Sequence, residues 1–219
     1  DTGFSGPLVI PNSVITIDSF AFYRCKGFTQ LTLSTSLETL GASSFYLCRR
    51  LKGDLIIPNK VKTIGPYCFY LCNHLDGSLT LPDSIETIGR YAFANCSQLT
   101  GTLKLPNSIQ TIENSTFINC YSLKGALTIP NSVKTIGYYC FYNCSHLNGK
   151  LTLSNTLESI SDFAFFNCVA LKEGLTIPET VKTIGSSAFY SCTNINGALK
   201  IPDSVEFIGS SAFASCSNL

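Results

Sequence analysis

LTIPNSVKTIGYYCFYNCSHL, residues 127–147, decides the fold, because it recurs nine times with small changes. Alignment of the copies on their first Leu gives repeat starts at residues 8, 31, 55, 79, 103, 127, 151, 175 and 199. The shared pattern is L-x-[IL]-P-x-S-[VI]-x-T-I-G-x-x-[AC]-F-x-x-C-x-x-L-x-G-x. A repeat of this regularity predicts one elongated domain over residues 1–219, in which each coil buries its apolar side chains against its neighbours.

The unit divides into three predicted segments. Residues 127–129 alternate apolar, polar and apolar, which predicts a short strand that pairs in parallel with its counterparts and ends at Pro130. Residues 133–136 predict a second extended piece, bent because its apolar residues are three apart. Phe141 and Cys144 are also three apart, which predicts one or two turns of helix.

The residue before T-I in each unit forms a column of charged and amide side chains. Stacked strands lie about 4.8 Å apart, so like charges in such a column would repel. No two neighbours share a sign, which favours a solvent-facing ladder in this register. The column reads Glu38, Lys62, Glu86, Gln110, Lys134, Glu158, Lys182, Glu206.

Composition excludes several classes of function. Charged residues are 13% of the chain, the net charge is +1, and no basic cluster occurs, so we expect no nucleic-acid partner. No apolar run approaches the length of a membrane span and no signal peptide opens the sequence, so we expect no direct membrane insertion. Phe4 and Gly6 fit the tail of a preceding unit and Leu219 stops inside one, so we expect a piece of a longer protein.

The unit resembles the BspA-type leucine-rich repeat of bacterial and protozoan surface proteins. The resemblance covers residues 8–219, and its specific A-F-x-x-C element occurs at residues 92–96, 188–192 and 212–216. It implies a secreted or surface-anchored protein used in adhesion to host cells, matrix proteins or other microbes. Departures at residues 18–20, at 113–116 and at Glu173, where Gly or Ala is usual, bear on local geometry and not on the family.

Pattern and resemblance together give the expected fold. We expect an α/β leucine-rich-repeat solenoid of about nine 24-residue coils, with a parallel sheet on the concave side and short helices on the convex side. Because its coils are uncapped, such a solenoid exposes strand edges, which predicts possible end-to-end self-association.

The eleven cysteines and two histidines are the first candidates for chemistry. Nine cysteines form one column, but stacked Cβ atoms lie roughly 4.8 Å apart whereas a disulfide needs roughly 3.5 to 4.5 Å. We therefore expect buried free thiols that act as small apolar fillers. His74 and His146 lie three units apart, too far to share a metal. No triad, phosphate loop or carboxylate pair stands outside the repeat columns, so we expect no enzyme, cofactor or metal.

Two outward columns are candidate binding surfaces. The first is the middle of the first strand, typical of solenoid binding faces and equally typical of an ordinary exposed strand: Thr80, Lys104, Thr128, Thr152, Thr176 and Lys200. The second is a possible convex aromatic surface, whose rings either stack on a ligand or lean on the neighbouring coil: Tyr46, Tyr70, Tyr142 and Tyr190. Three N-x-[ST] sequons are possible N-glycosylation sites, with chance occurrence as the alternative: Asn95, Asn114 and Asn143.

The sequence thus favours a non-enzymatic extracellular or cell-surface recognition module. Its expected partner is a protein or glycoprotein ligand on a host or microbial surface. Two alternatives remain: a structural spacer that presents another domain, and an intracellular protein-interaction scaffold, which free thiols would permit.

Overall fold

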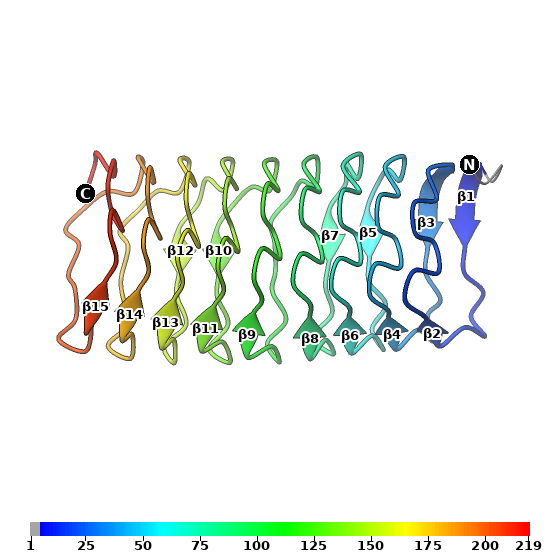
Figure 1. Ribbon diagram of the computed structural model, residues 1–219, viewed down its shortest axis with the longest axis horizontal. Helices are drawn as coiled ribbons and strands as arrows, with labels where there is room; N and C mark the ends of the chain where they lie inside the picture. Colours follow the sequence, from blue (N-terminus) through cyan, green and yellow to red (C-terminus); the bar gives the residue numbers. More distant parts are fainter. Residues whose placement is uncertain (1–4) are drawn as a thin grey trace.

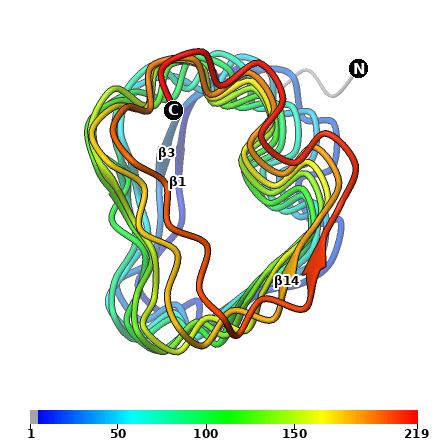
Figure 2. The ribbon, with the colours of Figure 1, turned by 90° about the vertical axis from the view of Figure 1, so that its left-hand side faces the viewer.

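The computed structural model describes residues 5–219 as a rod of stacked coils, with the first and last of these residues at opposite ends of the rod (Figure 1). It is a parallel β-solenoid of about eight turns. Viewed along the rod, the coils follow nearly the same outline, with the two rows of strands on different sides (Figure 2). Residues 1–4, including Phe4, which was expected to end a preceding unit, lie outside the described residues.

The first row of strands comes from the L-x-I segments. They pair in parallel, two at a time, as β1 with β3, β5 with β7 and β10 with β12. We call the surface of this row, including the equivalent residues of coils without a strand, the first-strand face. The strands are β1 (Gly6–Val9), β3 (Phe28–Thr32), β5 (Leu55–Ile56), β7 (Leu79–Thr80), β10 (Leu127–Thr128) and β12 (Leu151–Thr152).

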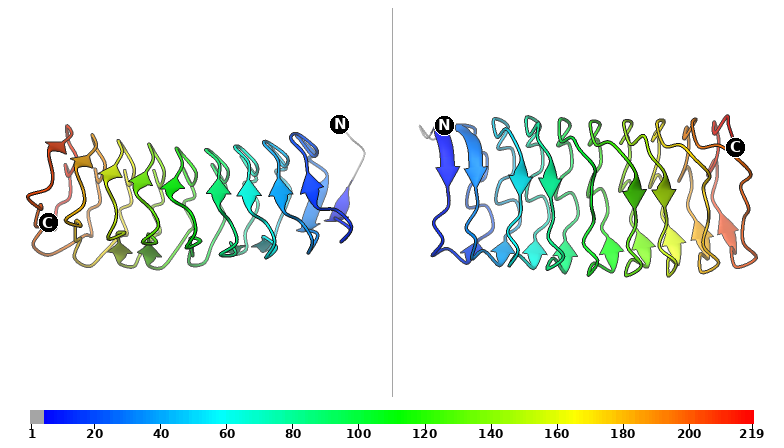
Figure 3. Two further views of the ribbon diagram at one scale, coloured as in Figure 1. Left: turned by 90° about the horizontal axis from the view of Figure 1, so that it is seen from below. Right: turned by 180° about the vertical axis from the view of Figure 1, so that it is seen from behind.

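The second row comes from the T-I segments, and we call its surface the second-strand face. It forms two parallel sheets, β2-β4-β6-β8 and β9-β11-β13-β14-β15, in which each residue pairs with its repeat equivalent, as Thr135 does with Thr111 and Ser159 (Figures 1 and 3). The strands are β2 (Thr16–Ile17), β4 (Thr39–Leu40), β6 (Thr63–Ile64), β8 (Thr87–Ile88), β9 (Thr111–Ile112), β11 (Thr135–Ile136), β13 (Ser159–Ile160), β14 (Thr183–Ile184) and β15 (Phe207–Ile208).

The core repeats with the coils. Each coil contributes one Phe, and the rings form a continuous stack in which neighbouring planes are nearly parallel. Phe141, for example, lies 5.5 Å from Phe117 and 5.3 Å from Phe165 between ring centroids, and all three are fully buried. Because each ring needs a ring on both sides, a coil is stabilised mainly by its neighbours.

The expected short helices on the convex side are wrong, and with them the α/β class. Residues 5–219 contain no helix; the segments after each T-I strand are stacked turns. The reason lies in the backbone: every such segment holds two non-glycine residues with positive φ, such as Tyr139 at 56° and Asn143 at 59°. An α-helix requires consecutive residues near φ −63°, so these residues interrupt it every fourth position.

The hydrogen bonds of these turn segments show what replaces the helix. The N–H groups of Tyr139, Phe141 and Asn143 donate to carbonyls of the next coil, at 2.8–3.1 Å. Between them, Tyr142 and Cys144 donate to the residue three positions earlier. The segment therefore alternates bonds within and between coils, and its surface is called the turn face below.

The thiols are free and buried, as expected. All eleven cysteines are free, and all except the half-buried Cys25 are buried. Each column thiol from Cys48 onward donates to a Phe carbonyl of the preceding coil, as Cys168 does to Phe141 at 3.1 Å. Burial raises the pKa of Cys68, Cys120 and Cys168 to about 12.

These raised pKa values predict alkaline sensitivity. Between about pH 9 and 12 the unfolded chain releases thiol protons that the native chain keeps, so the free energy of unfolding falls as pH rises, by up to about 1.4 kcal/mol per pH unit for each thiol. The melting temperature should decrease from pH 8 to 10, and less steeply in Cys168→Ala. Val181→Ala, which removes buried carbon but no titrating proton, should keep the wild-type slope. Equal slopes in all three proteins would contradict this origin.

Candidate recognition surfaces

The first-strand face is an unbroken row of exposed side chains. The middle residue of every first segment points to solvent, as its alternation predicted, and Ile56 and Val9 are 62% and 64% exposed. The row includes each strand residue proposed from sequence: Thr80, Lys104, Thr128, Thr152, Thr176 and Lys200.

The two lysines of this face already have anionic partners. Lys104 Nζ lies 3.2 Å from Asp83 Oδ2, and Lys200 Nζ lies 3.4 Å from Glu179 Oε1. In each pair the acid comes from the turn of the preceding coil. Exposed pairs of this kind contribute only about 0–1 kcal/mol to stability, but they neutralise the face. Its recognition chemistry is therefore that of hydroxyl groups and aliphatic carbon.

Two hollows open on the first-strand face where its strands are not paired. One, of about 420 Å³, lies between the coils of β3 and β5. Its lining includes the apolar side chains of Leu31, Leu33 and Ile56 and the polar side chains of Thr32 and Thr80. The other, of about 320 Å³, is lined by residues 102–105 together with Asn107, Ala126, Thr128 and Pro130. The face thus combines a hydroxyl row with apolar recesses.

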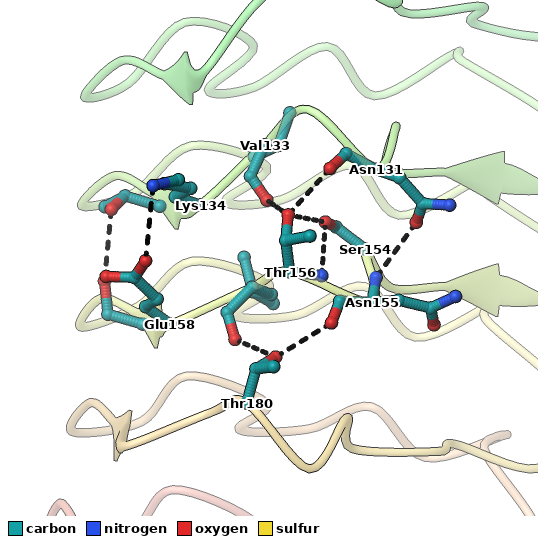
Figure 4. A network of polar contacts seen from close by, with 11 residues as sticks. Asn131, Val133, Lys134, Ser154, Asn155, Thr156, Glu158 and Thr180 are labelled. Atoms are coloured by element: carbon teal, nitrogen blue, oxygen red, sulfur yellow. Dashed lines mark hydrogen bonds and ion pairs between the residues drawn. The ribbon is translucent and has the colours of Figure 1, made fainter.

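The turns beside this face carry a polar network that links successive coils (Figure 4). Ser154 replaces the usual Pro, and its Oγ accepts from the N–H of Thr156 at 3.2 Å. Thr156 Oγ1 donates to the Asn131 carbonyl at 2.7 Å, and Thr180 Oγ1 donates in the same way to the Asn155 carbonyl at 3.1 Å. These bonds connect successive coils along the edge of the face, which favours a pre-organised binding surface.

The charged column on the second-strand face is solvent-facing, as predicted. All eight of its side chains are exposed. Lys134 lies 3.7 Å from Glu158 (Figure 4). Lys182 lies 3.7 Å from Glu206, and both pairs join neighbouring coils. Opposite charges of this column therefore form ion pairs between neighbouring coils, which confirms the register inferred from the alternation.

The aromatic column is less accessible than a stacking surface requires. Tyr46, Tyr70, Tyr142 and Tyr190 are half-buried. Tyr46 lies 4.9 Å from both Tyr23 and Tyr70, so its two ring faces are covered. Burial, followed by the neighbouring tyrosines, raises the pKa of Tyr70. This geometry favours the interpretation that the rings lean on neighbouring coils and leave their edges to solvent.

Sequence reasoning missed a second aromatic column and an asparagine ladder on the turn face. Tyr67 stacks on Tyr91 at 4.8 Å, and Tyr139 on Phe163 at 4.8 Å. The ladder joins side-chain amides of successive coils at 2.9–3.0 Å: Asn95, Asn119, Asn143 and Asn167. The signal was visible as an Asn before four consecutive column cysteines.

The sequons fall at two kinds of position. Asn95 and Asn143 are half-buried members of the asparagine ladder. Asn114 is exposed, and its Oδ1 accepts from the N–H of Tyr138 at 2.9 Å. N-glycosylation at the three sites stays a prediction, with the folded geometry most open at Asn114.

The histidines stand apart, as expected, and both are exposed. His146 Nδ1 contacts the Tyr121 carbonyl at 2.7 Å and Ser145 Oγ at 3.3 Å. Within residues 5–219 no group of three His, Cys, Asp or Glu side chains could hold a metal. The same residues include no helix able to cross a membrane.

Comparisons with known proteins agree with the repeat pattern. A family model for the BspA type leucine rich repeat region matches six copies, over residues 6–124, 64–196 and 125–219. A search of curated proteins found no match.

Several solved structures are similar in fold. A leucine-rich repeat protein from Eubacterium ventriosum has a TM-score of 0.63 and 22% identity, over 97% of this chain and 65% of its own. A leucine rich cell surface protein from Faecalibacterium prausnitzii has a TM-score of 0.53 and 24% identity, over 98% of this chain and 77% of its own. The pneumococcal vaccine antigen PcpA has a TM-score of 0.53 and 21% identity, over 97% and 66%. At these identities the likeness concerns the fold alone.

Proposed function

Because the chain belongs to the BspA-type leucine-rich repeat family, we propose that it is a non-enzymatic recognition module of a cell surface. It binds a protein or glycoprotein ligand through its first-strand face, and its role is adhesion to host cells, matrix proteins or other microbes. One structural relative is described as a cell surface protein and another as a vaccine antigen, which supports a location at the cell surface.

The observation that carries the proposal is the continuity of the first-strand face. One exposed residue per coil follows the whole rod, the two lysines of this row are neutralised within the molecule, and apolar hollows open beside it. A ligand that spans several coils would gain many weak contacts on a surface that is already ordered. The aromatic turn face is a weaker candidate, since interior rings such as Tyr46 have both faces covered.

The test introduces three negative charges in the middle of the face. Thr128→Glu, Thr152→Glu and Thr176→Glu together should weaken binding of the protein to host-cell surfaces and matrix glycoproteins at least tenfold, because unpaired carboxylates would have to be desolvated at the contact. Surface plasmon resonance on immobilised glycoproteins and attachment of protein-coated beads to cells would measure this.

A matched control exists away from the first-strand face. Arg50→Glu with Gln98→Glu changes the net charge by the same three units, two from the first substitution and one from the second, at exposed positions of the turns that follow the column cysteines. This variant should bind like the wild type. If both variants lose binding equally, the effect is one of net charge, and the first-strand face is not the site.

A structural spacer is the second candidate function, and one observation favours it. The two ends of the described chain lie at opposite ends of the rod, as they do in a stalk (Figure 1). A spacer role predicts that the triple Glu variant behaves like the wild type in every binding assay.

A further inference from the structure

One junction between coils differs from all others in residues 5–219. β8 and β9 are successive strands of the second row, yet they are not paired, and residues 103–105 form no first strand to pair with β7. β8 and β9 also stand visibly further apart than other neighbours in their row (Figures 1 and 3). Every other junction keeps at least one strand ladder.

A glycine column explains why the coils normally approach so closely. The residue after each T-I strand is usually Gly, and a Cβ added there would collide with the backbone of the preceding coil: 2.4 Å from the Pro66 nitrogen at Gly89 and 2.4 Å from the Asp162 nitrogen at Gly185. These glycines donate to the preceding coil at 2.7–2.8 Å. Glu113 occupies this column in β9's coil, so its Cβ meets the same space.

A second exception to the glycine column shows how far a small side chain lengthens the hydrogen bond between coils. Ser161 also stands in the glycine column, yet β11 and β13 remain paired. Its N–H lies 3.0 Å from the Ile136 carbonyl, against 2.8 Å for Gly137 and the Ile112 carbonyl. The small side chain of Ser161 therefore lengthens this hydrogen bond but leaves the strands paired. At the junction with Glu113 the strands are not paired.

Charge adds to the separation at Glu113. A hollow of about 460 Å³ lies at the unpaired strands and is lined by Glu86 and Glu113 together with Thr87, Ser108 and Gln110. The charged column offers no cation here, because Gln110 follows Glu86. Two carboxylates at one opening repel each other, which opposes closure of the strands.

The turn side of the same junction is intact. Tyr91 and Phe93 donate to carbonyls of the next coil at 3.1 and 3.0 Å, and Lys124 donates to the Gly101 carbonyl at 2.9 Å, beside an isolated parallel bridge between Thr102 and Lys124. Phe93 stacks on Phe117 at 5.5 Å. Between the strand rows only side-chain bonds remain, such as Asn107 to Asp83 at 3.2 Å.

We infer that the junction between residues 79–102 and 103–126 is a hinge. Its pivot is the bonded turn face and the following loop, and it opens on the side of the unpaired strands, where the Glu86 and Glu113 carboxylates separate. The two rigid arms are the solenoid before residue 103 and the solenoid from residue 103 onward. This inference does not depend on what the first-strand face binds.

Hydrogen exchange tests the hinge directly. In the wild type, the amides of Gln110 and Glu113 should exchange at least tenfold faster than those of Lys134 and Gly137, which donate to the preceding coil at 2.9 and 2.8 Å. Glu113→Gly restores the column residue and should slow exchange at 110–113 at least tenfold. It should also narrow the distribution of bend angles seen by electron microscopy.

Two further variants make the test specific. Ser161→Gly introduces the same residue at a junction that is already paired, so it should change exchange at residues 158–161 less than twofold. Glu113→Gln keeps the Cβ and removes the charge, so the strands at this junction should stay unpaired and their amides should still exchange fast. The hinge would be overturned if the wild-type amides of Gln110 and Glu113 were as protected as those of Lys134 and Gly137. Equal changes in exchange caused by Glu113→Gly and Ser161→Gly would also overturn it.

Discussion

Phe141→Ala is expected to lower the free energy of unfolding by about 3–5 kcal/mol, the usual cost of a large cavity in a well-packed core. Phe141 is fully buried, and its ring is nearly parallel to Phe117 and Phe165, with interplanar angles of 5° and 7°. Its loss removes two stacked contacts and leaves a void that neighbouring coils cannot fill without shifting. Urea denaturation followed by circular dichroism measures the change.

The matched control is a phenylalanine outside the stack of buried rings. Phe20 is 60% exposed, so Phe20→Ala should change stability by less than about 0.5 kcal/mol. Because coils depend on their neighbours, Phe141→Ala should also separate the unfolding of the coils before residue 127 from that of the coils after residue 150. A single transition at the wild-type midpoint would show that the phenylalanine stack is not the main source of cohesion.

Asn143→Val should destabilise the protein by about 2–4 kcal/mol, although Asn143 is only half-buried. Two costs combine. Asn143 has φ 59°, a conformation that is especially unfavourable for a β-branched residue. Its side chain also donates to Asn119 at 3.0 Å and accepts from Asn167 at 2.9 Å, so the ladder loses two hydrogen bonds. Thermal and urea denaturation give the free-energy difference.

Asn143→Gly separates the two costs. Glycine adopts positive φ readily, so this variant loses the ladder bonds without the backbone strain, and we expect a smaller loss of about 1–2 kcal/mol. If the Gly and Val variants were equally stable, the positive φ at Asn143 would carry no strain.

Sequence reasoning succeeded where the repeat imposes one side-chain environment. The exposure of Thr128, the burial of Phe141 and the free thiol of Cys144 all follow from their columns. The alternating charges likewise predicted the register that pairs Lys134 with Glu158. Each of these features depends only on which residues recur at one position of the unit, and the sequence contains nine copies of that unit.

The helix prediction failed because spacing does not determine φ. Phe141 and Cys144 are three apart, which suits a helix and a stack of turns equally. Positive φ is usually marked by Gly, Asn or Asp, yet here Leu47, Tyr67 and Tyr139 also adopt it. Their strain is offset by bonds to the next coil, which is a tertiary effect and so is invisible in one unit.

The recognition surfaces were only partly predictable. The exposed positions of the first-strand column could be recognised in the sequence. The hollows, however, depend on which strands fail to pair, and no residue pattern predicted which strands those are. Glu113 did stand out as a departure from the glycine column. Ser161 departs from the same column with an intact ladder, so sequence alone could not say which departure opens the junction.

The stacking direction has a mechanical consequence. Hydrogen bonds between coils run along the rod, so tension applied to its two ends loads the junctions in series, and the weakest junction yields first. That junction is the one between β8 and β9, where no strand ladder resists the pull. A coil adds only about 4.8 Å to the rod while stacked but roughly 80 Å when its 24 residues are drawn out. Under load the molecule would lengthen in large steps, absorbing work before anything attached to it is torn away.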